Sequence, residues 1–164
     1  MSKYIVAPIT AGILLALAGT AHAVTKQSTF QVTATVTENC VISAAPMNLG
    51  DFNGTNDLEA VSVITVRCTS GTDFDVGLNA GLTGSFTNRV LTRVGGGGQL
   101  VYNLFTDADH TSVWNDSTNR SGGLGAGMAT AVTLDVYGQL LASQNDGEID
   151  EGSYTDTITA TVEY

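Results

Sequence analysis

The chain has 164 residues, of which 43% are hydrophobic, and this length and composition predict one ordinary globular domain and exclude a wholly disordered chain. It carries 6 basic against 16 acidic residues, a formal net charge of −10. This acidic balance argues against nucleic acid or anionic lipid as the main partner, because both favour clustered Lys and Arg.

The first 23 residues have the features of an export signal. Lys3 gives the positive start, Tyr4–Leu17 is largely apolar, and Ala21-His22-Ala23 matches the small-x-small cleavage pattern. The apolar stretch is shorter than the about 20 residues that a membrane-spanning helix needs. We therefore expect residues 1–23 to be a signal peptide, and its removal would leave 141 residues with a net charge of −11.

Beyond the signal, apolar residues recur with a period of two rather than 3.6, the pattern of half-buried β-strands. Two further segments, Val61–Cys68 and Leu100–Phe105, are apolar on both faces, as expected of central strands in a packed sheet. The alternating segments are Thr29–Thr37, Phe74–Ala80, Val132–Tyr137 and Ile158–Tyr164.

Clusters of turn-forming residues separate these strands. No segment outside the signal shows helical periodicity over three turns, so the sequence predicts an all-β protein, an antiparallel β-sandwich of about seven short strands. The predicted turns are Asn53-Gly54, Gly95–Gly98, Ser121–Gly123 and Asn145–Gly147.

The alternating segments at the two ends of the mature chain raise a question of function. Thr29–Thr37 precedes the first cysteine, and Thr155–Tyr164 ends at the last residue of the sequence. A sandwich that closes on a terminal strand can leave an unpaired edge, onto which another strand can add. Alternation alone leaves open whether these segments pair between molecules or within one sheet.

The two cysteines, Cys40 and Cys68, are expected to form a disulfide, because export places the chain in an oxidising compartment. Free thiols for catalysis or metal binding are the alternative, but the spacing is not CxxC and histidines are too few. Closure of the intervening loop would contribute about 3–4 kcal/mol of stability.

Catalytic and metal-binding patterns are weak in this sequence. His110, the one histidine after cleavage, lies in a predicted turn. Asp107, Asp109 and Asp116 lack the ligand spacing of a calcium loop, and Gly95–Gly98 is followed by neither Lys-Ser/Thr nor a helix, which excludes a P-loop. We expect a protein that is not an enzyme, with no metal site and no cofactor, and interpret the acidic loops as solvated surface.

Several motifs occur together in the order of one known family. Leu100–Trp114 matches the pattern L-x-Y-x-L-[FY]-x-D-A followed by V-W, and Gly152–Tyr164 contains G-x-Y-x-D-T. In these motifs the chain resembles the spore coat protein U domain family, which includes subunits of archaic (Csu-type) chaperone–usher pili. Met47–Gly54 departs from the family's hydrophobic-Phe-Gly element, and Asn115 stands where Gly is common. Further matches are Cys40, Cys68, Arg89 and Val136-Tyr137-Gly138.

The resemblance implies an incomplete immunoglobulin-like antiparallel β-sandwich that lacks its last strand and carries an N-terminal donor strand. A chaperone would fill the open groove first, and the N-terminal extension of the next subunit would replace it, a form of strand addition. Residues 24–38 would be the donor-strand extension and residues 39–164 the pilin domain. Tyr164 would be the chaperone-anchoring C-terminus. The side chains entering the neighbour's groove would be Phe30, Val32, Ala34 and Val36.

On this basis we expect a structural subunit of a cell-surface pilus, exported through the periplasm and serving attachment or biofilm formation. Its partners would be a periplasmic chaperone, an outer-membrane usher and identical or related pilin subunits. The alternative is a self-contained secreted or periplasmic β-sandwich that binds a ligand or forms a coat. In that case Thr29–Thr37 would pair within its own sheet.

Overall fold

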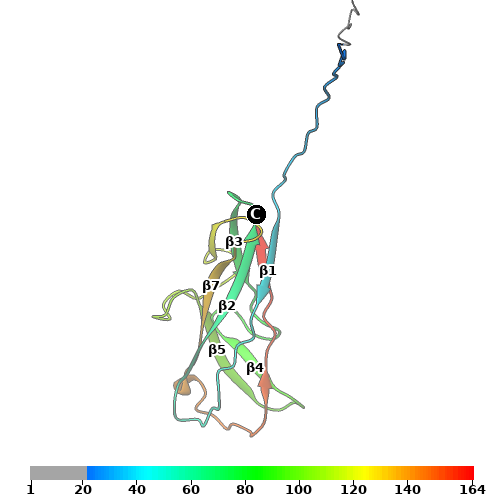
Figure 1. Cartoon of the computed structure of the whole chain (residues 1–164). Coiled ribbons are helices and arrows are strands. Elements are labelled where there is room, and N and C mark those ends of the chain that lie inside the picture. Colours follow the sequence, from blue (N-terminus) through cyan, green and yellow to red (C-terminus); the bar gives the residue numbers. More distant parts are fainter. Residues whose placement is uncertain (1–21) are drawn as a thin grey trace, which may run out of the picture. The chain divides into compact units, whose positions relative to one another are not determined.

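The computed structural model describes residues 22–164, so the expected signal peptide lies outside the described residues except for its last two. The chain divides into two units, Met1–Thr35 and Val36–Tyr164. Residues 22–39 contain no strand or helix, and each of them is exposed. All strands of the described residues lie in the second unit (Figure 1). Within residues 22–164 no helix is long and apolar enough to span a membrane.

The second unit is an antiparallel sandwich, which confirms the predicted fold class. One sheet has six strands in the order β1-β2-β7-β5-β4-β8, and the other has three in the order β6-β3-β9. The strands are β1 (Cys40–Ala44), β2 (Leu58–Cys68), β3 (Asp73–Leu78), β4 (Arg89–Arg93), β5 (Gln99–Phe105), β6 (Ser121–Leu124), β7 (Val132–Leu140), β8 (Tyr154–Thr155) and β9 (Ala160–Glu163), with a short 3-10 helix, η1 (Ala142–Gln144), after β7.

The period of two in the sequence becomes the burial pattern of the strands. Alternate side chains of β2, β3 and β5 point between the two sheets and bury apolar surface there, which is the main stabilising term of such a sandwich. Trp114, between β5 and β6, is wholly buried in this core, and its Nε1 donates a 2.8 Å hydrogen bond to the carbonyl of Val76. The strand core comprises Ile64, Val66, Cys68, Phe74, Val76, Leu78, Leu100, Tyr102, Leu104, Val136 and Leu140.

The predicted turn at Ser121–Gly123 is wrong, because these residues begin β6, which pairs with β3. A Cβ atom at Gly122 would collide with the side chain of Asp75 and the carbonyl of Phe74. Glycine therefore stands here because two backbones approach closely, rather than because the chain turns. The turn at Gly95–Gly98 is confirmed as the connection between β4 and β5.

The predicted turn that contains His110 is also confirmed. Both carboxylate oxygens of Asp107 accept hydrogen bonds, from the N–H of Thr111 (3.0 Å), its hydroxyl (2.8 Å) and the N–H of Ser112 (2.8 Å). The loop brings the chain from β5 back over the sheet to Trp114, and His110 within it has a φ of 53°, in the left-handed region.

The Asp107→Asn variant is expected to lose stability at neutral pH. Hydrogen bonds from Thr111 and Ser112 lower the pKa of this carboxyl, with the Thr111 N–H first among them. A lowered pKa in the folded state stabilises the protein above the ordinary pKa of Asp and loses that effect as the pH falls through the folded value. Urea midpoints should therefore differ between wild type and Asp107→Asn at pH 7 and converge towards pH 2. A constant difference across this range would contradict the assignment.

Candidate functional site

A groove with an apolar floor lies between the open edges of the two sheets. β1 ends the six-stranded sheet and β9 ends the three-stranded one, so each strand pairs on one side only. Two cavities of about 350 and 600 Å³ lie between the segment that follows β1 and the segment that contains β8 and β9. They share three lining residues, Met47, Leu49 and Leu91, and so form one continuous groove. Its floor is the hydrophobic core: Ile64, Leu78, Leu104 and Val136 at one end, and Leu58, Leu100 and Leu140 at the other.

The edge of β9 offers free backbone groups to this groove. The N–H of Leu78 and the C=O of Val76 bond to the loop after β5, on the side of β3 away from β9. Backbone groups alternate in direction along an antiparallel strand, so Gly77, between Val76 and Leu78, turns its N–H and C=O towards β9. There it pairs with Thr161. Ala160 and Val162 therefore turn their N–H and C=O groups towards the open edge, where another strand can pair with them.

The side chains of the terminal segment alternate in the same register. Ile158, Ala160 and Val162 are half-buried and pack against the core, whereas Thr159 and Thr161 are exposed. The segment therefore presents an apolar side to the interior and unpaired backbone at its edge, the two features that an added strand needs.

Asp156 fixes the place where the terminal segment leaves one sheet and joins the other. β8 pairs with β4, and β9 pairs with β3. Between them, one oxygen of Asp156 accepts hydrogen bonds from the N–H groups of Leu82 (2.9 Å) and Thr157 (2.7 Å), and the other accepts from the hydroxyl of Tyr102 (2.7 Å). Burial, and then the hydrogen bond to Asp156, raise the pKa of the Tyr102 hydroxyl, which stays a donor at physiological pH.

Buried Arg89 ties the core to this crossover. Its guanidinium is wholly buried and donates to the carbonyls of Asn79 (3.1 and 2.8 Å) and Trp114 (2.7 Å) and to Oδ1 of Asn103 (2.8 Å). Burial lowers the pKa of this guanidinium. Asn79 in turn donates its N–H to the carbonyl of Thr159 (3.1 Å) and accepts the Thr159 N–H at Oδ1 (2.9 Å), so the groove edge is held by the core.

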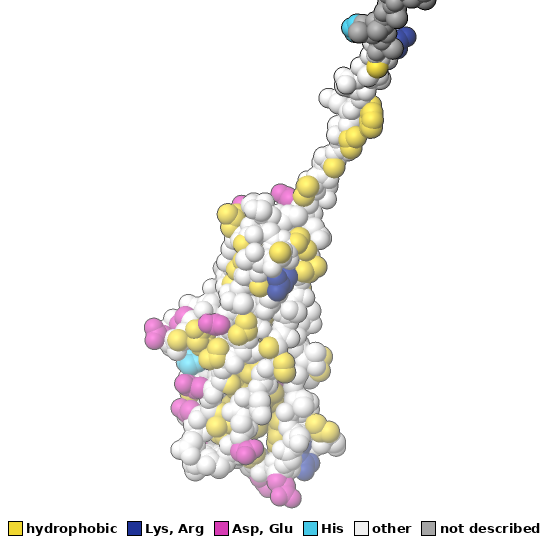
Figure 2. Space-filling view, in the orientation of Figure 1, with side chains coloured by type: hydrophobic (Ala, Val, Ile, Leu, Met, Phe, Trp, Pro, Cys, Tyr) yellow, Lys and Arg dark blue, Asp and Glu magenta, His cyan; other side chains and the backbone are white. Residues whose placement is uncertain are grey.

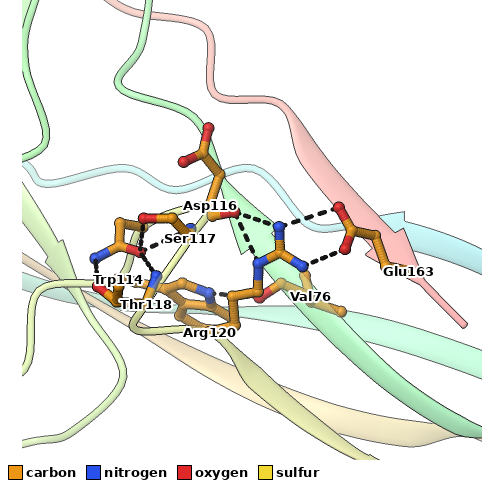
Figure 3. A network of polar contacts seen from close by, with 8 residues as sticks. Val76, Trp114, Asp116, Ser117, Thr118, Arg120 and Glu163 are labelled. Atoms are coloured by element: carbon orange, nitrogen blue, oxygen red, sulfur yellow. Dashed lines mark hydrogen bonds and ion pairs between the residues drawn. The ribbon is translucent and has the colours of Figure 1, made fainter.

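The far end of β9 is held by an ion pair. Figure 3 shows Arg120 between the backbone carbonyl of Asp116 and the carboxylate of Glu163 on β9. The hydrogen bond and charge of Arg120 lower the pKa of Glu163, whereas the same hydrogen bond raises the pKa of Arg120. Arg120 is half-buried and Glu163 is exposed to water, which weakens the pair, so the pair positions the end of the strand more than it stabilises the fold.

The predicted disulfide between Cys40 and Cys68 is present and joins the first residue of β1 to the last residue of β2. Tyr164 directly follows β9 and is 55% exposed. His110 packs edge-on against Phe105, and its Nδ1 lies 3.7 Å from a carboxylate oxygen of Glu59. In residues 22–164 no three His, Cys, Asp or Glu side chains gather as metal ligands.

The four side chains expected to act as donors lie in the exposed segment. Phe30, Val32 and Val36 are 87%, 83% and 84% exposed, and Ala34 is exposed as well. In Figure 2 the hydrophobic side chains of this segment lie exposed along its surface. Sequence reasoning found this segment but missed the groove residues Met47, Leu49 and Leu91.

The profile of the Spore Coat Protein U domain family matches residues 26–161, so the chain belongs to this family. Among solved structures it resembles a chain of the CsuC–CsuE chaperone–tip adhesion subunit pre-assembly complex from the archaic chaperone–usher Csu pili of Acinetobacter baumannii. The identity is 27% and the TM-score 0.58; the match covers 79% of this chain and 41% of that one. The chain therefore spans less than half of the length of that relative. No curated protein sequence matches it significantly.

Proposed function

We propose that this protein is a structural subunit of a cell-surface pilus and that it polymerises by donor-strand exchange. Residues 24–38 are the donor extension, residues 39–164 the pilin domain, and residues 1–23 the signal peptide that directs export. One observation carries the proposal: the same chain has an open apolar groove beside an unpaired edge strand and an exposed alternating segment of the kind that fills one.

The donor segment and the groove complement each other in chemistry. Phe30, Val32, Ala34 and Val36 lie on one face of an extended strand and would meet the apolar floor of the neighbour's groove. Burying these four side chains contributes about 5–9 kcal/mol before the cost of ordering the segment. The backbone of the same strand would pair with the free N–H and C=O groups of Ala160 and Val162.

The relatives support the rest of the assembly route. A periplasmic chaperone would cover the groove before polymerisation, and an outer-membrane usher would pass subunits to the cell surface, as the chaperone–usher origin of the structural relative suggests. Tyr164, at the end of the edge strand, would anchor the chain to the chaperone through its C-terminal carboxylate. Attachment or biofilm formation would be the function of the fibre.

The alternative of a self-contained sandwich needs Thr29–Thr37 to pair within its own sheet. The structure gives no strand in residues 22–39, and the edge of β9 has no second neighbour among the described residues. These observations favour pairing between subunits over a closed single chain.

Replacing Val32 with Asp tests the proposal. The carboxylate would have to enter an apolar groove, where an unpaired charge costs several kcal/mol, so fibre yield should fall by about tenfold or more. The matched control is Thr33→Asp, whose side chain points away from the groove and should leave fibre yield within about twofold of wild type. Electron microscopy counts the fibres, and sedimentation measures the fraction of purified subunits that has polymerised. Equal yields from the two variants would refute the donor assignment.

A further inference from the structure

Two kinds of contact hold the junction between the donor extension and the domain: a pair of hydrogen bonds and a disulfide. Asn39 accepts a hydrogen bond from the N–H of Thr69 (2.9 Å) and donates its own N–H to the Thr69 hydroxyl (3.1 Å). At the next residue Cys40 lies directly opposite Cys68, and the disulfide joins them. The disulfide therefore lies at the first residue of β1, where the extension joins the sandwich.

β1 is at the same time the start of one wall of the groove. It pairs only with β2, through five residue pairs, and has no neighbour on its other side within the described sheets. The residues at its end and just beyond it line the groove: Ala44, Ala45, Pro46, Met47 and Leu49. If β1 separated from β2, the groove would lose this wall.

This arrangement matters once subunits are joined into a fibre, and the inference rests on the proposed function. Each domain would be pulled through its own extension, which enters at Cys40, and would hold its other neighbour in the groove. Without the disulfide, tension would load the end of an edge strand, whose hydrogen bonds can open one pair at a time. β1 would then separate from β2, the groove would lose this wall, and the donor strand of the other neighbour would be released.

We infer that the Cys40–Cys68 disulfide is a force bypass: it carries tension from the donor extension past β1, so that the groove wall does not bear this tension. Through the disulfide, tension passes from Cys40 to the end of β2 and leaves β1 unloaded. β2 is far better held than β1, because it lies between two strands and pairs with β7 over nine residues. The site that holds one neighbour is thereby protected from the pull of the other.

Stretching single fibres before and after chemical reduction tests this inference. Intact fibres should show no extension that corresponds to β1. After reduction, each failing domain should first release residues 40–57, a step of at most about 60 Å, and the fibre lifetime under constant load should fall by about tenfold. The lifetime close to zero load should change much less. A reduced fibre without the step, or with equally shortened lifetimes at high and near-zero load, would overturn the inference.

Two variants separate the contributions. Thr69→Ala removes the hydroxyl partner of Asn39 but keeps the disulfide, so its fibres should survive load like wild type. If they fail as reduced fibres do, the hydrogen bonds rather than the disulfide carry the force, and the inference is wrong. The Cys40→Ala/Cys68→Ala double variant should reproduce the reduced fibres. If it does not fold, reduction of preformed wild-type fibres still gives the answer.

A failure of the proposed function is distinguishable from a failure of this inference. If the chain forms no fibres, the polymer model fails. The bypass can then be tested by pulling a single full-length chain between its two termini, where the oxidised domain must withhold the residues between Cys40 and Cys68. A reduced chain that does not first extend by the β1 step would contradict the bypass in that experiment too.

Discussion

Removing Thr25–Thr37 is expected to abolish self-polymerisation and yet leave a subunit that accepts a wild-type strand. The deletion takes away the proposed donor side chains but no residue of any strand, because the first strand, β1, begins at Cys40. The truncated subunit has a groove but nothing to offer a neighbour. Added to wild-type subunits, it should bind one end of each growing fibre and stop growth there, so mean fibre length should fall as its proportion rises.

A synthetic peptide of residues 24–38 provides the control for this deletion. It should bind the truncated subunit and raise its thermal stability, because a ligand that binds only the folded state stabilises it. The same peptide with Asp in place of Val32 should not. Truncated chains that polymerise like wild type would show that assembly does not depend on this segment.

Replacing Arg89 with Met is expected to destabilise the domain by about 3–5 kcal/mol, even though the new side chain has a similar length. The wholly buried guanidinium satisfies the carbonyls of Asn79 and Trp114 and the side chain of Asn103, and these buried acceptors would lose their donor together. The loss should also loosen the groove edge, because Asn79 holds Thr159.

Arg67→Met is the matched control for Arg89→Met. Arg67 is only partly buried and makes one hydrogen bond, to the carbonyl of Ala129 (2.9 Å), so its loss should cost about 0.5–1 kcal/mol. Unfolding in urea, monitored by the fluorescence of Trp114, measures both variants. Equal losses of stability would mean that the buried network around Arg89 contributes nothing specific.

The sandwich could be predicted from the sequence because its main strands are either alternating or apolar on both faces over five or more residues. β2, β3, β5 and β7 all lie within or over the expected segments. β6 could not be predicted in this way, since Gly122 and Gly123 bring no side chains to form a pattern, and their place depends on how closely β3 approaches. A short edge strand is determined by its partner more than by its own residues.

The two halves of the candidate site differ in how far sequence could find them. The proposed donor segment is a local pattern, visible in residues 30–36 alone. The groove is assembled from distant parts of the chain, including Met47, Leu91 and Ile158, and it exists because two sheets leave their edges apart. The roles of Asn79 and Asp156 likewise appear only when the crossover between the sheets is known.

Hydrogen exchange at the edge of β9 tests the central claim most directly. In the polymer, a donor strand should bond to the outward amides of Ala160 and Val162, so their exchange should slow by at least about a hundredfold relative to the unpolymerised subunit. The amide of Thr161, which faces β3, should be protected in both states and serves as the internal control. If Ala160 and Val162 exchange equally fast in fibre and subunit while Thr161 stays protected, no strand adds at this edge, and assembly by donor-strand exchange is contradicted.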